Sequence, residues 1–257
     1  MATRTRRSQR RTEALSRERI VEAAVELLDT AGESGLTFRA LTERLATGPG
    51  AIYWHVANKD ELLSAATDAV VTAAVAVGHT TAGAPQPPPE KPAPEPTPEA
   101  SPQDGIRGVA LGLFDAIERH PWLATQLAVQ LTRSPWGTVT PRIFESIGQQ
   151  VRALDVPESE WFTVASALVH YILGAAGQNA VNSVSARDFA PGVDRARFLD
   201  TVSKAWEELD PDEYPFTRAV SDQMREHDDR EQFLAGVDLV LAGITATRHR
   251  ESGRVQE

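Results

Sequence analysis

The sequence contains no cysteine, which excludes disulfide bonds, thiolate metal sites and a cysteine nucleophile. It also lacks a long apolar run. The longest one, residues 161–176, is interrupted by Thr163, Ser166 and His170, and it is shorter than the roughly 20 residues that a membrane helix needs. The basic N-terminus has no apolar core and so is unlike a secretory signal. These absences predict a soluble protein with no membrane partner, and they suit a cytoplasmic location.

Catalytic and cofactor-binding motifs are also missing. The sequence has no GxxxxGK[ST] loop, no GxGxxG turn and no HExxH pair. Its six histidines are scattered without metal-ligand spacing. The neighbouring Asp228 and Asp229 have the character of a helix start. We therefore expect no enzyme activity, no cofactor and no metal site.

Charge is distributed unevenly along the chain. The net charge is −10, yet residues 1–59 hold ten Lys and Arg against seven Asp and Glu. The remaining residues hold 16 basic and 29 acidic side chains, which gives them a net charge of −13. A basic head on an acidic body favours a polyanion as the partner of the head.

Residues 37–59 predict two short helices joined by a tight turn. Leu41 and Leu45 lie four residues apart, and so do Ile52 and Val56. Each pair therefore shares one helix face, and the two faces can pack against each other. This is the pattern of a helix-turn-helix, whose second helix enters the DNA major groove.

The ends of these two helices are also marked. Thr37 suits the N-cap of the first helix, and Gly48 and Pro49 suit the start of the second. The residues left to face outward on the second helix are Pro49, Gly50, Ala51 and Tyr53.

From residue 16 to about residue 74, the sequence resembles the DNA-binding domain of the tetracycline-repressor (TetR) family. The run AIYWHVANKDELL, residues 51–63, carries most of the resemblance, and the amphipathic segment RERIVEAAVELLDTAG, residues 17–32, precedes it. Apolar residues of that segment recur at the spacing of a buried helical stripe, and Gly32 then ends the helix. The stripe consists of Ile20, Ala23, Ala24, Leu27, Leu28 and Ala31.

The resemblance implies phosphate contacts from Tyr53, His55 and Lys59. Thr37 can add another phosphate contact. Arg39 can grip guanine through two hydrogen bonds, which would supply roughly 1–3 kcal/mol of discrimination. A solvated helix arginine is the alternative for Arg39, and a partly buried packing ring is the alternative for Tyr53.

This sequence departs from the family at residues 48–51, Gly-Pro-Gly-Ala, where relatives often carry polar side chains. Base readout should therefore be sparse and depend on Arg39, DNA shape and the N-terminal arginines. Trp54 is assigned to packing. The arginines either enter a minor groove or belong to a tail that adds only salt-sensitive attraction; they are Arg4, Arg6, Arg7, Arg10 and Arg11.

Composition predicts four segments: a basic arm over 1–15, the helix-turn-helix domain over 16–78, a proline-rich linker over 79–103 and a helical domain over 104–250. The second segment includes a connecting helix that starts near Asn58, with Glu61 placed as in a capping box. Nine of the 17 prolines fall within residues 85–102, a composition that opposes packing. A partner domain that binds this proline-rich stretch is the alternative to a plain linker.

The predicted fold class is all-α, because no stretch shows sustained period-two alternation. A three-helix DNA-binding domain precedes a helical bundle that resembles the ligand-binding and dimerisation domain of the same family. Helix patterns in this bundle cover residues 105–119, 121–132, 141–154, 159–183, 194–209, 212–227 and 229–248.

The family resemblance implies a homodimer with a four-helix interface, to which each subunit contributes two of these helices. Residues 161–180 are apolar nearly all round, and they include the small residues Gly174, Ala175, Ala176 and Gly177, which permit close approach. The last helix carries an apolar stripe of Phe233, Val237, Val240, Leu241 and Ile244. An ordinary monomer core is the alternative.

The family resemblance also implies a pocket for a small-molecule effector within the bundle. Pockets combine aromatic walls with a few polar groups. The candidate residues are Phe114, Trp122, Gln126, Gln130, Trp136, Phe144, His170, Tyr171, Gln178 and Asn182.

We therefore expect a dimeric repressor that binds a palindromic double-stranded DNA operator and is released by the effector through a population shift. A transcriptional activator and an effector-independent DNA-binding protein of the same fold remain the alternatives.

Overall fold

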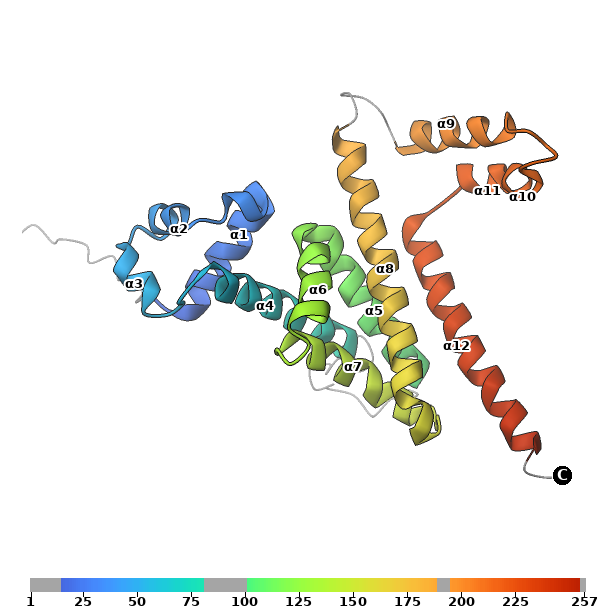
Figure 1. The fold of residues 1–257 in the computed structure, drawn as a ribbon, viewed down its shortest axis with the longest axis horizontal. Coiled ribbons are helices and arrows are strands. Elements are labelled where there is room, and N and C mark those ends of the chain that lie inside the picture. Colours follow the sequence, from blue (N-terminus) through green and yellow to red (C-terminus); the bar gives the residue numbers. More distant parts are fainter. Residues whose placement is uncertain (1–14, 81–100, 189–194, 255–257) are drawn as a thin grey trace, which may run out of the picture. The chain divides into compact units, whose positions relative to one another are not determined.

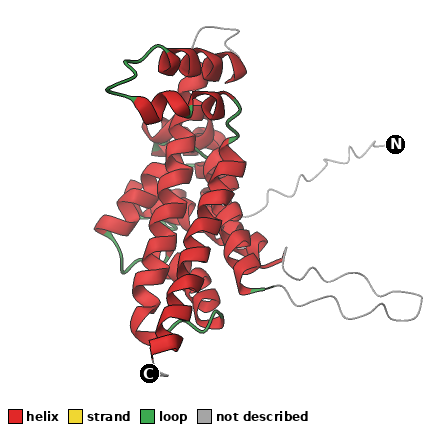
Figure 2. Cartoon of the chain, turned by 90° about the vertical axis from the view of Figure 1, so that its right-hand side faces the viewer, coloured by secondary structure: helices red, strands yellow, loops and turns green. Residues whose placement is uncertain are grey.

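The computed structural model describes residues 15–80, 101–188 and 195–254. All regular structure in these ranges is helical, and Figure 2 shows no strand among them. The predicted all-α class is therefore confirmed. Contacts divide the chain into two compact units, a head that ends at Ala66 and a body that begins at Thr67. The expected arginine arm and most of the proline-rich segment lie outside the described residues.

The head contains three helices and the start of a fourth: α1 (Arg17–Gly35), α2 (Phe38–Leu45), α3 (Pro49–Tyr53) and α4 (Lys59–Thr80) (Figure 1). As predicted, apolar side chains of these helices form the core, except that Leu45, expected to pack together with Leu41, is only half-buried. The fully or almost fully buried members are Ile20, Leu28, Leu36, Leu41, Ile52 and Val56. This core fixes how α3 is presented, because Ile52 and Val56 anchor it from one side.

The predicted stripe of α1 needs one correction. Ala31 is exposed and Leu27 is half-buried, whereas Val21 is buried. Gly32 has φ 64° and leaves helical geometry directly after Ala31, so the stripe ends one turn early. The positive φ of Gly32 kinks the helix where its end was predicted, and helical structure then resumes to Gly35.

Side-chain caps mark the starts of the head helices. Thr37 Oγ1 accepts a hydrogen bond from the Ala40 N–H at 3.1 Å, and Asn58 Oδ1 accepts one from the Glu61 N–H at 2.8 Å. Glu61 in turn accepts the Ala57 N–H at 2.8 Å, which lowers the pKa of its carboxyl group. Asn58 and Glu61 thus form the expected capping box, with one difference. The Glu61 carboxylate accepts the N–H of Ala57, the residue before the N-cap Asn58, and not that of Asn58 itself. Gly48 and Pro49 open α3 as predicted.

The body contains the rest of α4 and the remaining helices. They are α5 (Pro102–Arg119), α6 (Trp122–Arg133), α7 (Val139–Ala153), a 3-10 turn η1 (Glu158–Glu160), α8 (Trp161–Asp188), α9 (Arg195–Glu207), α10 (Pro215–Ala219), α11 (Ser221–Arg225) and α12 (Asp229–Arg254). The expected linker 79–103 is helical at both ends, because α4 reaches Thr80 and Pro102 opens α5. Proline suits the first helical position, and Ser101 caps it.

Helix α8 lies at the centre of the body and contacts α5, α6, α7 and α12 (Figure 1). Its Leu168, Val169 and Ile172 are fully buried. Within the single chain, however, α8 still exposes Phe162 and Val181. The α12 stripe is also used within the chain, since Phe233, Val237 and Leu241 are buried. Its assignment to a dimer interface is therefore wrong for these three residues.

Helices α4 and α5 approach each other closely at Gly112. A Cβ atom at this position would lie 2.2 Å from the carbonyl oxygen of Ala74. Helix α7 is tied to α4 as well, by an ion pair between Arg142 Nε and Asp68 Oδ1 at 3.3 Å. The C-terminal part of α4 is thus an integral part of the body.

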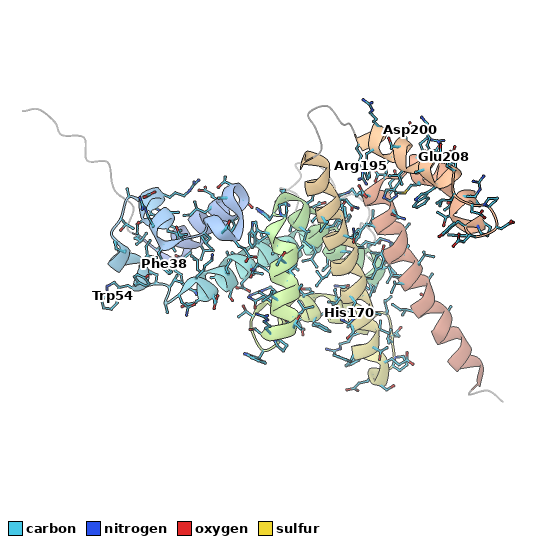
Figure 3. The ribbon with its side chains drawn as sticks, turned by 45° about the horizontal axis from the view of Figure 1, so that its top comes forward. Phe38, Trp54, His170, Arg195, Asp200 and Glu208 are labelled. Atoms are coloured by element: carbon cyan, nitrogen blue, oxygen red, sulfur yellow. The ribbon has the colours of Figure 1, made fainter. Side chains whose placement is uncertain are left out.

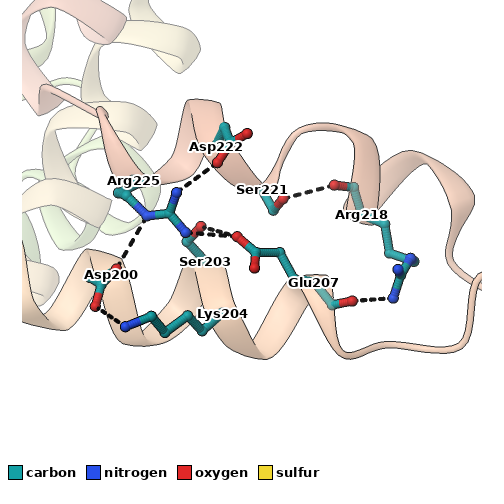
Figure 4. A network of polar contacts seen from close by, with 8 residues as sticks. All are labelled: Asp200, Ser203, Lys204, Glu207, Arg218, Ser221, Asp222 and Arg225. Carbon is teal, nitrogen blue, oxygen red and sulfur yellow. Dashed lines mark hydrogen bonds and ion pairs between the residues drawn. The ribbon is translucent and has the colours of Figure 1, made fainter.

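Helices α9, α10 and α11 form a small arm beside the start of α12 (Figure 1). The predicted helix over 212–227 is in fact two short helices that meet at Val220. Arg225 holds the arm together through Asp200, Glu207 and Asp222, at 3.2, 2.7 and 2.6 Å (Figure 4). The hydrogen bond from Arg225 to Glu207 is the main cause that raises the pKa of the guanidinium.

Candidate nucleic-acid interface and body cavity

Helix α3 presents one face of the head to solvent. Pro49, Gly50 and Tyr53 are exposed, Ala51 is half-exposed and Ile52 is fully buried. No atom lies within 4 Å of a Cβ built on Gly50. The predicted outward set therefore lies at the surface, where a DNA groove can reach it.

Tyr53 has a packing role in addition to its exposure. Its ring stacks on Phe38 with centroids 4.5 Å apart and an interplanar angle of 16°. The stack joins the end of α3 to the start of α2. Because 53% of Tyr53 stays exposed, the side chain can still contact a phosphate from this fixed position.

Trp54 is not a packing residue, contrary to expectation. It is 89% exposed at the C-terminal end of α3, and Figure 3 shows it at the edge of the head. Ile52 and Val56 face the core, so the position midway between them points away from it. That spacing was present in the sequence and could have identified Trp54 as a surface residue.

Arg39 extends from the surface of α2 with 88% of its side chain exposed. Its Nε lies 2.9 Å from Glu43 Oε1, one helical turn away, and this hydrogen bond raises the pKa of the guanidinium. Exposed pairs of this kind contribute little stability. A guanine base or a phosphate can therefore compete for the Arg39 guanidinium.

The remaining predicted contact residues are partly engaged. Thr37 uses its oxygen as a cap, which leaves its hydroxyl hydrogen available to a phosphate. Lys59 is half-buried and donates to the carbonyl oxygen of Glu33 near the end of α1. An ammonium has three donors, so this bond does not prevent a phosphate contact. His55 is half-buried next to the exposed Trp54.

The ten predicted pocket residues differ in burial and in position. Phe114, Trp122, Gln126 and Gln130 are buried in the bundle. Trp136 is 82% exposed, and His170 is exposed on α8 (Figure 3). Phe144 is half-buried and stacks on Phe162. As a set they indicate a region of the bundle, because composition does not reveal which helix faces converge.

Three of the ten, Tyr171, Gln178 and Asn182, line a cavity of about 420 Å³ between α8 and α12. Sequence reasoning missed Asn179, which lies two helical turns after Tyr171 on the same face of α8. The other lining residues are Ala175, His227, Asp229, Gln232, Phe233, Ala235, Gly236 and Leu239.

The described residues contain no cluster of three or more His, Asp or Glu side chains that could hold a metal ion. In the same ranges, no helix is long and apolar enough to cross a bilayer.

Two family models match the chain. The model of bacterial regulatory proteins of the tetR family matches residues 20–66, and that of the tetracyclin repressor-like C-terminal domain matches residues 95–248. Tetracycline repressor protein class C of Escherichia coli is 44% identical over 66 residues, which is 26% of this chain and 28% of that repressor. The chain thus matches about a quarter of the length of such curated relatives.

Solved structures match over most of the chain. SCO7222, a TetR from Streptomyces coelicolor, is 68% identical with a TM-score of 0.76, and the match covers 91% of this chain and 99% of that one. ActR from the same organism, solved in complex with actinorhodin, has a TM-score of 0.67 at 22% identity, with 91% and 97% covered. The likeness to ActR concerns the fold alone.

Proposed function

The chain belongs to the TetR family of bacterial regulatory proteins, and from this premise we propose that it is a dimeric repressor that binds a palindromic DNA operator and is released by a small-molecule effector. The observation that carries the proposal is the solvent-exposed face of α3. Ile52 and Val56 hold this helix firmly from behind, while Pro49, Gly50 and Tyr53 stay accessible. Such a helix can enter a major groove.

Phosphate contacts supply most of the affinity in this proposal, and base contacts supply the specificity. Tyr53, His55 and Lys59 surround α3 and are proposed to contact phosphates, with Thr37 at the start of α2. Arg39 is the proposed reader of a guanine. Pro49, Gly50 and Ala51 offer backbone groups and a methyl group to the bases.

Dimerisation is proposed through the exposed sides of α8 and α12. Leu239 is 74% exposed on α12, and Val181 is exposed on α8. Gly174 of α8 and Gly243 of α12 are also exposed and would permit another helix to approach. Large exposed apolar side chains on neighbouring helices favour a protein partner. A second copy of the chain would bring the two heads onto two half-sites.

Helix α4 is the proposed route from effector to DNA. In the body it touches α5 at Gly112 and is paired with α7 through Arg142 and Asp68. An effector that favours another arrangement of α5 or α7 would therefore displace α4. Since Lys59 begins this same helix in the head, the displacement would alter the presentation of α3.

Selection of duplexes from a random library by the full chain tests the proposal. We expect enrichment of a palindrome with half-sites about 34–36 Å apart. Footprinting and sedimentation should show one dimer per site, with binding that weakens as salt increases. A confirmed dimer that shows no preference among duplexes at moderate salt would contradict the proposal.

Arg39→Ala should relax recognition at one position of each half-site. Loss of a two-hydrogen-bond contact to guanine should reduce discrimination there by about 10-fold. The readout is competitive gel shift with the selected duplex and its single-base variants. Arg44→Ala is the matched control, because Arg44 also lies on α2 but is paired with Glu26 of α1. Equal weakening on all duplexes by Arg39→Ala would refute the base-reading role.

A further inference from the structure

The cavity between α8 and α12 has the size of a small-molecule site. Its volume of about 420 Å³ falls within the range of ligand pockets, which is roughly 300–1,000 Å³. Both helices are long and contact each other directly (Figure 1). Apart from His227, which precedes α12, the lining residues belong to these two helices.

The side-chain oxygen of Asn179 on the cavity wall has no hydrogen-bond partner. The residue is only 7% exposed, and its Oδ1 is buried with no donor within reach. A buried polar atom without a partner costs about 1–3 kcal/mol. The χ2 torsion of asparagine is broad, so the amide can turn its oxygen toward a donor in the cavity. A ligand that supplies an O–H or N–H group would remove this cost.

Aromatic rings form one side of the same cavity. Tyr171 and Phe233 line it, and their rings stack at 6.1 Å with an interplanar angle of 19°. Phe114 extends the group, with its ring 4.7 Å from that of Phe233. The Tyr171 hydroxyl donates to the carbonyl oxygen of Phe233 at 3.1 Å, which fixes the ring. A flat aromatic molecule can extend such a group of rings.

Gly236 is required for this arrangement. A Cβ atom there would lie 1.8 Å from the Tyr171 hydroxyl oxygen. Burial also raises the pKa of Tyr171, so its ring carries no charge at neutral pH.

The charged groups of the cavity are already paired. Asp229 accepts a hydrogen bond from Arg195, and His227 Nε2 lies 2.9 Å from the second Asp229 oxygen. Apart from Tyr171, no other lining residue carries an ionisable group. A charged ligand would lose its hydration without gaining a counterion. The cavity therefore suits a neutral molecule.

We propose that this cavity binds a neutral, flat aromatic compound with a hydroxyl group that donates to Asn179, as in a polycyclic phenol. The proposed function would make such a compound the effector, and this part of the inference rests on it. Leu239 belongs both to the cavity lining and to the proposed dimer surface, so a second copy would border the cavity. An apolar surface of that copy would leave the Asn179 oxygen without a donor. A small-molecule ligand is therefore the occupant that fits the cavity better than a second copy of the chain.

The test uses two flat neutral probes, 2-naphthol and 2-methoxynaphthalene. Only 2-naphthol has a hydroxyl group that can donate a hydrogen bond. Equilibrium dialysis with the full chain should show one 2-naphthol per chain. Asn179→Leu should weaken 2-naphthol binding by about 10-fold and leave 2-methoxynaphthalene unchanged. Leucine matches asparagine in size and removes an unsatisfied group, so this variant should fold. Gln149→Leu is the control, since its exposed amide lies on α7 and hydrogen-bonds to Glu145.

Ala175→Trp should fill the cavity and abolish binding of both probes. Equal 2-naphthol binding by the wild type, Asn179→Leu and Ala175→Trp would place the probe elsewhere and overturn the proposal. Absence of 2-naphthol binding would overturn it too, as would a crystal structure with a partner side chain in the cavity. A chain that binds 2-naphthol here but selects no DNA would support the cavity and contradict the proposed function.

Discussion

Gly50→Glu should reduce operator affinity by about 100-fold or more, because juxtaposed like charges cost several kcal/mol. The new carboxylate would stand on the exposed face of α3, where the phosphates and base edges of DNA approach. The head should nevertheless fold. No atom lies within 4 Å of the added Cβ, and glutamate is a better helix former than glycine. Gel shift with the selected duplex gives the affinity, and circular dichroism reports the folding.

Gly148→Glu provides the matched control for this prediction. Gly148 also has no atom within 4 Å of a built Cβ, but it lies on α7 in the body. The two variants change the net charge equally, so a general electrostatic effect would appear in both. If Gly50→Glu bound the duplex as tightly as Gly148→Glu does, α3 would not be the DNA-reading helix.

Gly112→Ala should destabilise the body by about 3 kcal/mol, since overpacking of a close contact costs roughly 1–3 kcal/mol or more. The added methyl group would lie 2.2 Å from the carbonyl oxygen of Ala74. The obstacle is a helix backbone and not a flexible side chain, so α4 and α5 would have to separate. Urea unfolding followed by circular dichroism measures the loss.

Gly148→Ala separates this steric effect from the general effect of replacing a helical glycine. It should be neutral or stabilise α7 by up to about 1 kcal/mol. If Gly112→Ala were as stable as Gly148→Ala, the close contact between Gly112 of α5 and the Ala74 carbonyl oxygen of α4 would be contradicted.

Local patterns predicted the head well. The helices of the head depend on caps and apolar residues a few positions apart, such as Thr37 with Leu41 and Ile52 with Val56. These signals are contained in short stretches of sequence. Trp54 shows the limit of residue type as evidence, because an aromatic ring favours a buried position whereas the position of Trp54 relative to Ile52 and Val56 points outward.

The cavity could not be predicted in this way. Its walls come from α8 and from the start of α12, which are separated by the whole arm. Tyr171 and Asn179 share a helix face, but no sequence pattern shows that Phe233 and Gly236 lie opposite. The break between α10 and α11 was equally hard to predict. No proline or glycine lies at Val220, where the two helices meet, and α11 packs on α9, which is distant in sequence.

The boundary between the two units falls inside α4, and the stretch from Lys59 to Ala74 contains neither glycine nor proline. It has no built-in hinge and should behave as a stiff rod of about 22 Å, at 1.5 Å per residue. A tilt of about 5° at one end of a rod this long displaces the other by about 2 Å. Under the proposed function, a tilt of the helix near Ala74 would therefore be carried along it to Lys59 and not be absorbed at a hinge.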